Sequence, residues 1–124
     1  MIKPFIAATV VMLILDAIWL TLNYTAHSKL IETVQKSAVE VRLIPALLVY
    51  ILIPAAVYYF AIEPSKTQAQ AALKGSLLGL SMYGLYDLTN LSTLKGWTVT
   101  MTIKDSLWGT VLCGIGSVAG FYFK

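Results

Sequence analysis

The stretch PFIAATVVMLILDAIWLTLNY, residues Pro4–Tyr24, decides the fold class of this chain. It has the length of about 20 residues that an α-helix needs to cross the hydrocarbon core of a bilayer. Apart from Asp16 it contains no charged residue. The stretch therefore predicts a transmembrane helix. Its aspartate calls for an explanation, because a carboxylate at the centre of such a helix costs about 2.5–3.5 kcal/mol on insertion scales.

Three further stretches have a similar length and a similar excess of apolar residues. They lie at residues 43–62, 71–94 and 103–123. We therefore expect an all-α integral membrane protein, a four-helix bundle formed by residues 1–124 as a single transmembrane domain, with spans at about 4–24, 43–62, 71–94 and 103–123. Pro54 should kink the second span, because proline lacks the backbone N–H that a helix uses.

The overall composition supports a location in lipid. The 124 residues are 58% hydrophobic and 12% charged, whereas soluble domains carry about 25% charged residues. The net charge of +3 comes from basic residues scattered singly near the ends of apolar runs. This pattern is typical of membrane anchoring, so we expect the lipid bilayer as a partner and no nucleic acid. Basic residues are balanced between the two sides, and no membrane orientation is predicted.

The segment between the first two spans, residues 23–42, has a different pattern. Leu30, Val34, Ala38 and Val41 recur at helical spacing, with charged residues elsewhere around the helix. This spacing predicts an amphipathic helix that lies on the membrane surface. His27 falls at its start, and we expect a lone histidine in such a place to be solvated.

Three aspartates fall inside predicted spans: Asp16, Asp87 and Asp105. The helical rise of about 1.5 Å per residue places all three in the same half of the bilayer, the half that faces residues 23–42. We therefore predict that the three carboxylates share one polar pocket near one membrane surface.

Each aspartate also has a polar neighbour on its own helical face. The pattern Asp-x-x-Trp occurs twice and puts Trp19 one turn from Asp16 and Trp108 one turn from Asp105. An indole N–H, a phenol or an amide can donate to a buried carboxylate and lower the cost of keeping it in lipid. The residues predicted to line the pocket are Asp16, Trp19, Tyr83, Tyr86, Asp87, Thr89, Asn90, Asp105 and Trp108.

Small residues recur every four positions in the third and fourth spans. The residues predicted to pack helices together are Gly75, Gly79, Gly109, Cys113, Gly116 and Gly120. Such seams let helix backbones approach closely in lipid. The fourth span carries two of these lines, one for an intramolecular and one for an intermolecular contact. We therefore expect a homo-oligomer or a subunit of a larger membrane complex.

Three functions remain open from the residues alone. Carboxylates that share a low-dielectric space titrate as a coupled set, which a proton relay or a cation exchanger needs. A self-satisfied network that only fixes the bundle of an accessory or structural subunit is the second possibility. A membrane-embedded lipid-modifying enzyme is the third, although the sequence shows no nucleophile–base pair, histidine cluster or phosphate loop. We favour proton or cation handling over an enzyme, and we predict no cofactor and no metal site.

Three stretches of the sequence are YDLTNLSTLKGW, which starts at Tyr86, LDAIWL and DSLWG. Together they resemble a bacterial family of small membrane proteins, domain of unknown function 2177. The family's motif reads Tyr-Asp-Leu-Thr-Asn-Leu-Ala-Thr-Leu, and Ser92 here replaces the alanine. The resemblance implies a four-helix protein of the bacterial inner membrane and no known activity. Relatives that resemble accessory genes near lipid-modifying enzymes keep the lipid alternative open. The resemblance supports treating these residues as one constellation: Asp16, Trp19, Tyr86, Asp87, Thr89, Asn90, Asp105, Trp108 and Gly109.

Overall fold

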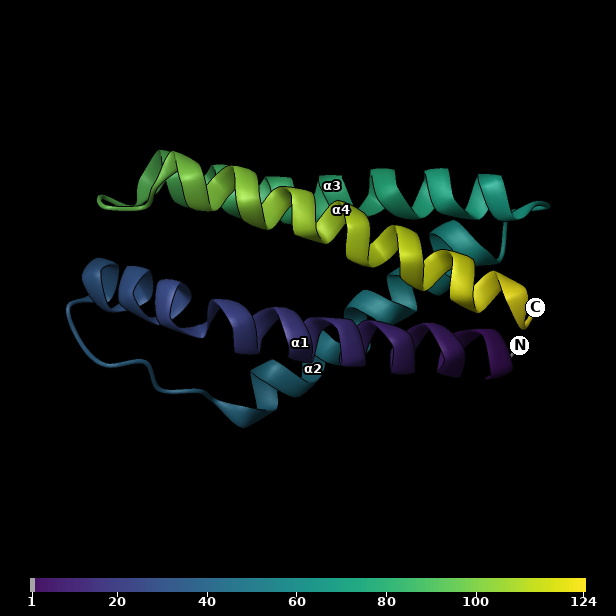
Figure 1. Ribbon diagram of the computed structural model, residues 1–124, viewed down its shortest axis with the longest axis horizontal. Helices are drawn as coiled ribbons and strands as arrows, with labels where there is room; N and C mark the ends of the chain where they lie inside the picture. The colour runs from purple at the N-terminus through teal and green to yellow at the C-terminus, as the bar shows by residue number, and fades with distance from the viewer. Residues whose placement is uncertain (1) are drawn as a thin grey trace.

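The computed structural model describes residues 2–124 and consists of long helices joined by short connections (Figure 1). The elements are α1 (Ile2–Gln35), α2 (Leu43–Val57), the π-helical turn η1 (Tyr58–Ile62), α3 (Gln68–Thr93) and α4 (Val99–Tyr122). Residues 2–124 thus contain four α-helices and no strand, which confirms the all-α class.

The helices run back and forth along one long axis. The N-terminus, the C-terminus and the turn between η1 and α3 lie at one end, and residues 36–42 and 94–98 lie toward the other (Figure 1). α3 and α4 lie side by side and antiparallel and make the most extensive contact between elements, while α1 packs against α4. α2 and η1 cross from α1 to α3.

The prediction of a separate surface helix between the first two spans is wrong. α1 continues without a break to Gln35, and residues 36–42 form no helix. The polar side chains at the expected break bond within the helix instead, since Thr21 and Asn23 donate to backbone carbonyls four residues earlier at 2.8 and 2.9 Å. The helix ends just before Lys36, whose φ of 60° places it in the left-handed region.

Pro54 lies inside α2 and is followed by the π-helical turn. In this turn the backbone N–H of Glu63 donates to the carbonyl of Tyr58 at 2.9 Å, a bond across five residues. The wider turn ends with Ile62 fully buried in the core, together with Val57. α2 and η1 thus span the predicted range 43–62 with a change of helix type in the last turn.

Glycines set the distance between α3 and α4. A Cβ placed on Gly79 would strike the carbonyl oxygen of Gly109, and one placed on Gly75 would strike Ser117 and lie 2.6 Å from the carbonyl oxygen of Cys113. The backbones approach at these positions more closely than any side chain would allow.

The second line of glycines on α4, Gly116 and Gly120, was expected to contact another protein chain, but it packs against other elements of the same chain. A Cβ on Gly116 would lie 2.5 Å from Cγ of Met12 in α1, and one on Gly120 would meet Ile62 of η1 and lie 2.9 Å from the carbonyl oxygen of Pro4. Both lines of α4 are therefore occupied within the chain. The prediction that one of these lines is free for an intermolecular contact is wrong.

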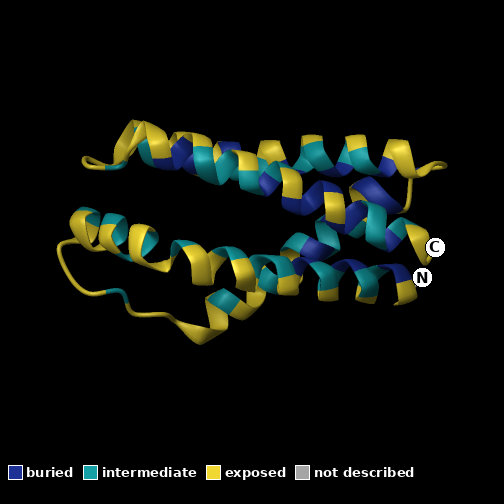
Figure 2. Cartoon of the chain, in the orientation of Figure 1, coloured by how far each residue is buried: buried dark blue, intermediate teal, exposed yellow. Residues whose placement is uncertain are grey.

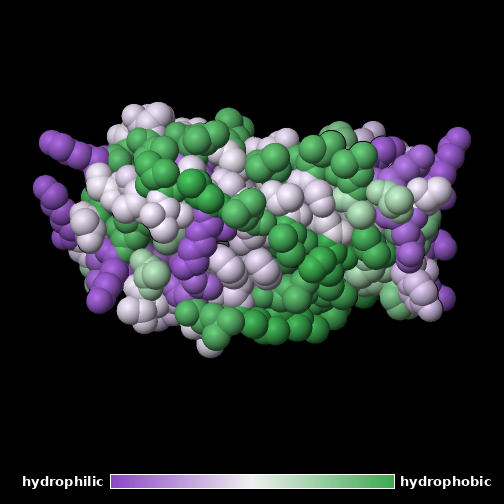
Figure 3. Space-filling view, turned by 45° about the horizontal axis from the view of Figure 1, so that its top comes forward, coloured by the Kyte–Doolittle hydropathy of each residue, from purple (hydrophilic) through white to green (hydrophobic). Residues whose placement is uncertain are grey.

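The most apolar helices face outward rather than into a core. α1 and the segment Leu43–Ile62 are long and apolar enough to cross a membrane, yet only 11% of the most apolar window of each is buried. Exposed and half-buried residues dominate α1 and α2 (Figure 2). In Figure 3 hydrophilic residues gather mainly at the two ends, and hydrophobic surface covers most of the face between them. Such a surface is typical of a protein that lies in lipid.

Candidate functional site

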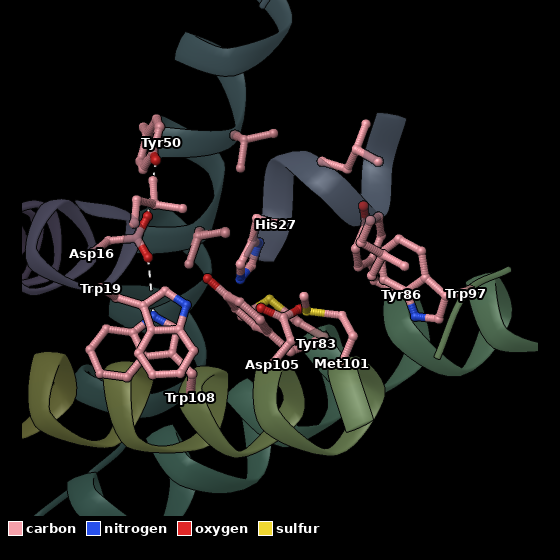
Figure 4. A pocket seen from close by; sticks show the side chains of 16 residues that line it. Asp16, Trp19, His27, Tyr50, Tyr83, Tyr86, Trp97, Met101, Asp105 and Trp108 are labelled. Atoms are coloured by element: carbon pink, nitrogen blue, oxygen red, sulfur yellow. Dashed lines mark hydrogen bonds between the residues drawn. The ribbon is translucent and has the colours of Figure 1, made fainter. Parts of the chain in front are cut away.

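A cavity of about 450 Å³ lies among α1, α2, α3 and α4, in the half of the molecule away from the chain termini. Its wall combines carboxylates, one imidazole and a large number of aromatic rings (Figure 4). The polar and aromatic lining residues are Asp16, Trp19, His27, Tyr50, Tyr83, Tyr86, Trp97, Asp105 and Trp108. Aliphatic side chains and methionines complete the wall.

Asp16 is held by donors from two other helices. The hydroxyl of Tyr50, on α2, donates to Oδ2 at 2.9 Å, and Nε1 of Trp108, on α4, donates to Oδ1 at 3.1 Å (Figure 4). Each carboxylate oxygen therefore has one donor. Hydrogen bonds of this kind offset the cost of placing the group in an apolar surrounding, and they join three helices at one side chain.

The two tryptophans are arranged differently from the pairing that their spacing predicted. Trp108 donates to Asp16 rather than to Asp105, and its ring stacks on Trp19 with centroids 4.6 Å apart and planes 4° apart. The stacked rings pack α4 against α1, and the Trp108 indole therefore lies beside Asp16 of the neighbouring helix. Nε1 of Trp19 is buried without a hydrogen-bond partner. Nζ of Lys104 lies 5.6 Å from the centroid of the Trp19 ring.

Asp87 does not line the cavity, contrary to the expectation of a shared pocket. It is 0% exposed and lies where α3 packs on α4, with Asp105 beside it. Its Oδ2 accepts from the Ser106 hydroxyl at 3.4 Å, and its Oδ1 is buried without a partner. Only Asp16 and Asp105, of the three aspartates, line the cavity.

Other residues of the YDLTNLST motif divide between the cavity and the surface. Tyr86 lines the cavity and packs edge-on against Trp97, with ring centroids 6.1 Å apart. Thr89 is exposed and Asn90 is half-buried, and neither lines the cavity, contrary to the prediction for both residues. Successive residues of a helix are rotated by about 100°, so a run of five or six residues necessarily faces several directions.

Tyr83 reaches the cavity because Gly109 has no side chain. A Cβ on Gly109 would strike the ring of Tyr83, which crosses α4 at this point. Tyr83 and Asp87 are four residues apart on α3, yet the long side chain of Tyr83 extends to the cavity wall, whereas Asp87 stays in the interface.

Three of the polar and aromatic lining residues were not predicted to line the pocket: His27, Tyr50 and Trp97. His27 was expected in a solvated loop, but it lies on the extension of α1, and its Nε2 is buried without a partner. Figure 4 shows its imidazole directed toward the same space as the Tyr83 ring. For Tyr50 the sequence did contain a signal, because its side chain is the only one in α2 that carries a hydroxyl group.

The cavity wall contains two carboxyl groups, those of Asp16 and Asp105, and no lysine or arginine lines it. Lys104, which is not a lining residue, lies beside Trp19. Within residues 2–124, no group of three or more His, Cys, Asp or Glu side chains is placed to hold a metal ion. The arrangement is suited to receive a positively charged group next to aromatic rings.

The chain belongs to the family of predicted membrane proteins described as DUF2177, whose model matches residues 1–122. This match confirms the family indicated by the YDLTNLSTLKGW motif and extends over nearly the whole chain. No curated protein and no solved structure matches this chain. Family and surface together establish a membrane protein, and the family description names no activity.

Proposed function

We propose that this member of the DUF2177 family crosses the bilayer four times, binds a cation in the cavity and exchanges it against protons. One observation carries the proposal. The carboxylate of Asp16 is fixed by Tyr50 and Trp108 at the wall of a cavity that no lysine or arginine lines. A carboxylate held in lipid is costly, and such groups mark ion and substrate pathways.

The lengths of α3 and α4 support four crossings. With 26 and 24 residues, they extend roughly 39 and 36 Å at about 1.5 Å per residue, more than the hydrocarbon core of about 30 Å. Their polar side chains are compatible with lipid because many face the partner helix or the cavity, as Asp87 and Asp105 do. α1 is longer than a span requires, and its last turns would extend beyond the hydrocarbon core.

The position of Asp87 supports proton exchange. It contacts Asp105 but does not line the cavity, and one of its carboxylate oxygens is unpartnered. Two carboxylates in contact within a low-dielectric interface cannot both carry a full charge at low cost. A cation that binds near Asp105 therefore favours release of a proton from this pair. Cation binding and proton release are coupled in this way.

The test measures proton release from liposomes that contain the purified protein and a pH-sensitive dye. An inward gradient of Na⁺, K⁺ or a quaternary ammonium ion is imposed in turn. We expect at least one cation to drive proton release, and we expect Asp16→Asn to abolish it, because asparagine keeps the shape but not the charge. Glu63→Gln serves as the control, since Glu63 directly follows η1, in the turn to α3 that lies at the end of the molecule with the chain termini. Equal flux through Asp16→Asn and the unchanged protein would contradict the proposal.

A lipid-directed function is the second possibility, and the apolar part of the cavity wall favours it. An acyl chain could lie against Leu20, Val49 and Ile53, which are lining residues. The same liposomes distinguish the two functions. Lipid turnover without any ion gradient, lost in Asp16→Asn, would replace cation exchange by lipid chemistry.

A further inference from the structure

We infer that the ligand of the cavity is a hydrophobic organic cation, an amine or quaternary ammonium with an attached ring or short chain, rather than a metal ion. The inference rests on the proposed function and specifies its substrate class. It is drawn from four features of the cavity: its carboxylates, its aromatic rings, its unpartnered polar atoms and the position of Lys104.

The carboxylates provide the charge but not a metal site. Asp16 and Asp105 lie on different helices, and each oxygen of Asp16 already accepts a hydrogen bond. Hard metal ions take six or more oxygen ligands, or keep much of their water. Two aspartates in a largely apolar wall do not replace that shell, and the described part of the chain has no group of three or more His, Cys, Asp or Glu side chains placed to hold a metal ion. An organic cation loses much less hydration and needs no fixed ligand geometry.

Aromatic rings surround the charged positions on several sides. The Trp19–Trp108 stack forms one part of the wall, and the Tyr86–Trp97 pair forms another. Six rings of Trp or Tyr line the cavity in all, and Figure 4 shows them on opposite sides of the space. The faces of such rings attract ammonium groups, and aromatic cages are used to recognise quaternary ammonium ions.

Two polar atoms in the wall lack a partner. Nε1 of Trp19 and Nε2 of His27 are both buried and unbonded, and both residues line the same cavity. Buried polar atoms in proteins are nearly always hydrogen-bonded to protein or to water. The Trp19 indole N–H can only donate, so ordered water is the partner that suits it, whereas Nε2 of a neutral imidazole can accept from the N–H of an amine ligand. Their grouping around one cavity indicates a hydrated binding cavity and not a sealed packing defect.

Lys104 already places an ammonium group against an aromatic ring of the cavity wall. Its Nζ lies 5.6 Å from the centroid of the ring of Trp19, which is a lining residue, while Lys104 itself is not. The lysine is the charged group that a bound cation would repel most directly. Removing it should therefore tighten binding of an organic cation.

The test uses protein in dodecyl maltoside micelles and isothermal titration calorimetry, with empty micelles to measure partitioning of each probe. The probes are benzyltrimethylammonium, its uncharged carbon isostere neopentylbenzene, and NaCl. We expect only benzyltrimethylammonium to bind above the micelle background. Asp16→Asn and Asp105→Asn should each weaken its binding by about ten-fold or more, because each removes one attractive charge.

Further variants separate the aromatic contribution from folding effects. Tyr86→Leu should weaken binding by about three-fold or more, within the range of a lost cation–π contact, whereas Tyr59→Leu, at a residue that is 67% exposed and outside the cavity, should not. Lys104→Met should tighten binding. Glu63→Gln should leave it unchanged. If the aspartate variants fail to fold, as judged by circular dichroism, the tyrosine and lysine variants still decide the question.

The outcomes distinguish this inference from the proposed function. Equal binding of neopentylbenzene, or no effect of Lys104→Met and Tyr86→Leu, would overturn the inference. If benzyltrimethylammonium does not bind but Na⁺ or K⁺ drives proton release that depends on Asp16, the cation is inorganic and the proposed function stands. If no cation binds and none drives flux, both proposals fail.

Discussion

Nε1 of Trp108 lies 3.1 Å from Oδ1 of Asp16, although the two residues are ninety-two positions apart in the sequence. The bond joins α4 to α1, and the Tyr50 hydroxyl joins α2 to the same carboxylate. The carboxyl group of Asp16, which is costly to place in lipid, thus connects α1, α2 and α4 through hydrogen bonds. Its removal should affect both the stability of the bundle and the charge of the cavity.

The two stacked tryptophans give a matched pair of variants. Trp108→Phe removes the donor to Asp16, so we expect the free energy of unfolding to fall by about 1.5–3 kcal/mol, the usual range for a hydrogen bond to a charged group. Trp19→Phe keeps a stacking ring and removes an N–H that has no partner, so it should cost less. Unfolding in mixed dodecyl sulfate and maltoside micelles, followed by circular dichroism, measures both. Equal losses would show that the bond to Asp16 contributes nothing.

Two glycines on α3 test the close approach to α4. Gly79→Ala places a methyl group against the carbonyl oxygen of Gly109, whereas a Cβ on Gly84 meets no atom within 4 Å. We expect Gly79→Ala to lower the unfolding free energy by about 1–3 kcal/mol, as overpacking does. Gly84→Ala should raise it by about 0.5–1 kcal/mol through helix propensity. The same unfolding assay applies, and a Gly79→Ala variant as stable as Gly84→Ala would contradict the close approach of α3 to α4 at Gly79 and Gly109.

The all-α class could be predicted because long apolar stretches without strand signals form helices. Of the helices in residues 2–124, α1 and the segment Leu43–Ile62 are long and apolar enough to cross a membrane. The predicted ranges 71–94 and 103–123 differ from α3 and α4 by a few residues at their ends. The surface helix was mispredicted because Asn23 and other polar residues suggested a break. Such residues can bond to their own helix, and then no break is needed. Spacing in a sequence shows which residues share a helical face but not whether the helix continues.

The candidate site could be predicted only within single helices. The spacing of Asp16 and Trp19 specifies a shared face, but not that Trp108 would supply the hydrogen bond from another helix. The rotation of one helix about its neighbour depends on contacts such as Gly79 against Gly109, which a single sequence shows only as a pattern of small residues. For the same reason Asp87 was expected at the cavity, and it lies in the α3–α4 interface.

Lys124 connects the end of α4 to the turn after η1. Its Nζ donates to the carbonyl oxygens of Ile62, Glu63 and Ser65 at 3.3, 2.7 and 2.8 Å. Lys124→Met leaves these carbonyls without their charged donor, so we expect faster amide hydrogen exchange at residues 63–67 and a loss of about 1–3 kcal/mol in stability. Lys66→Met is the control, because its side chain is exposed at the same turn. Unchanged exchange in Lys124→Met would show that water replaces the lysine without cost.

Asp87→Asn separates binding from proton exchange. Because Asp87 does not line the cavity but contacts Asp105, we expect the variant to bind benzyltrimethylammonium at least as tightly as the unchanged protein, since no proton has to leave the pair when the cation binds. Asparagine cannot release a proton at this position, so cation-driven proton release from liposomes should be lost. Ser106→Ala removes only the 3.4 Å hydrogen bond to Asp87 and should reduce proton release without abolishing it. A folded Asp87→Asn variant that retains full proton release would make Asp87 a structural residue, and one that loses binding would place its charge within reach of the ligand.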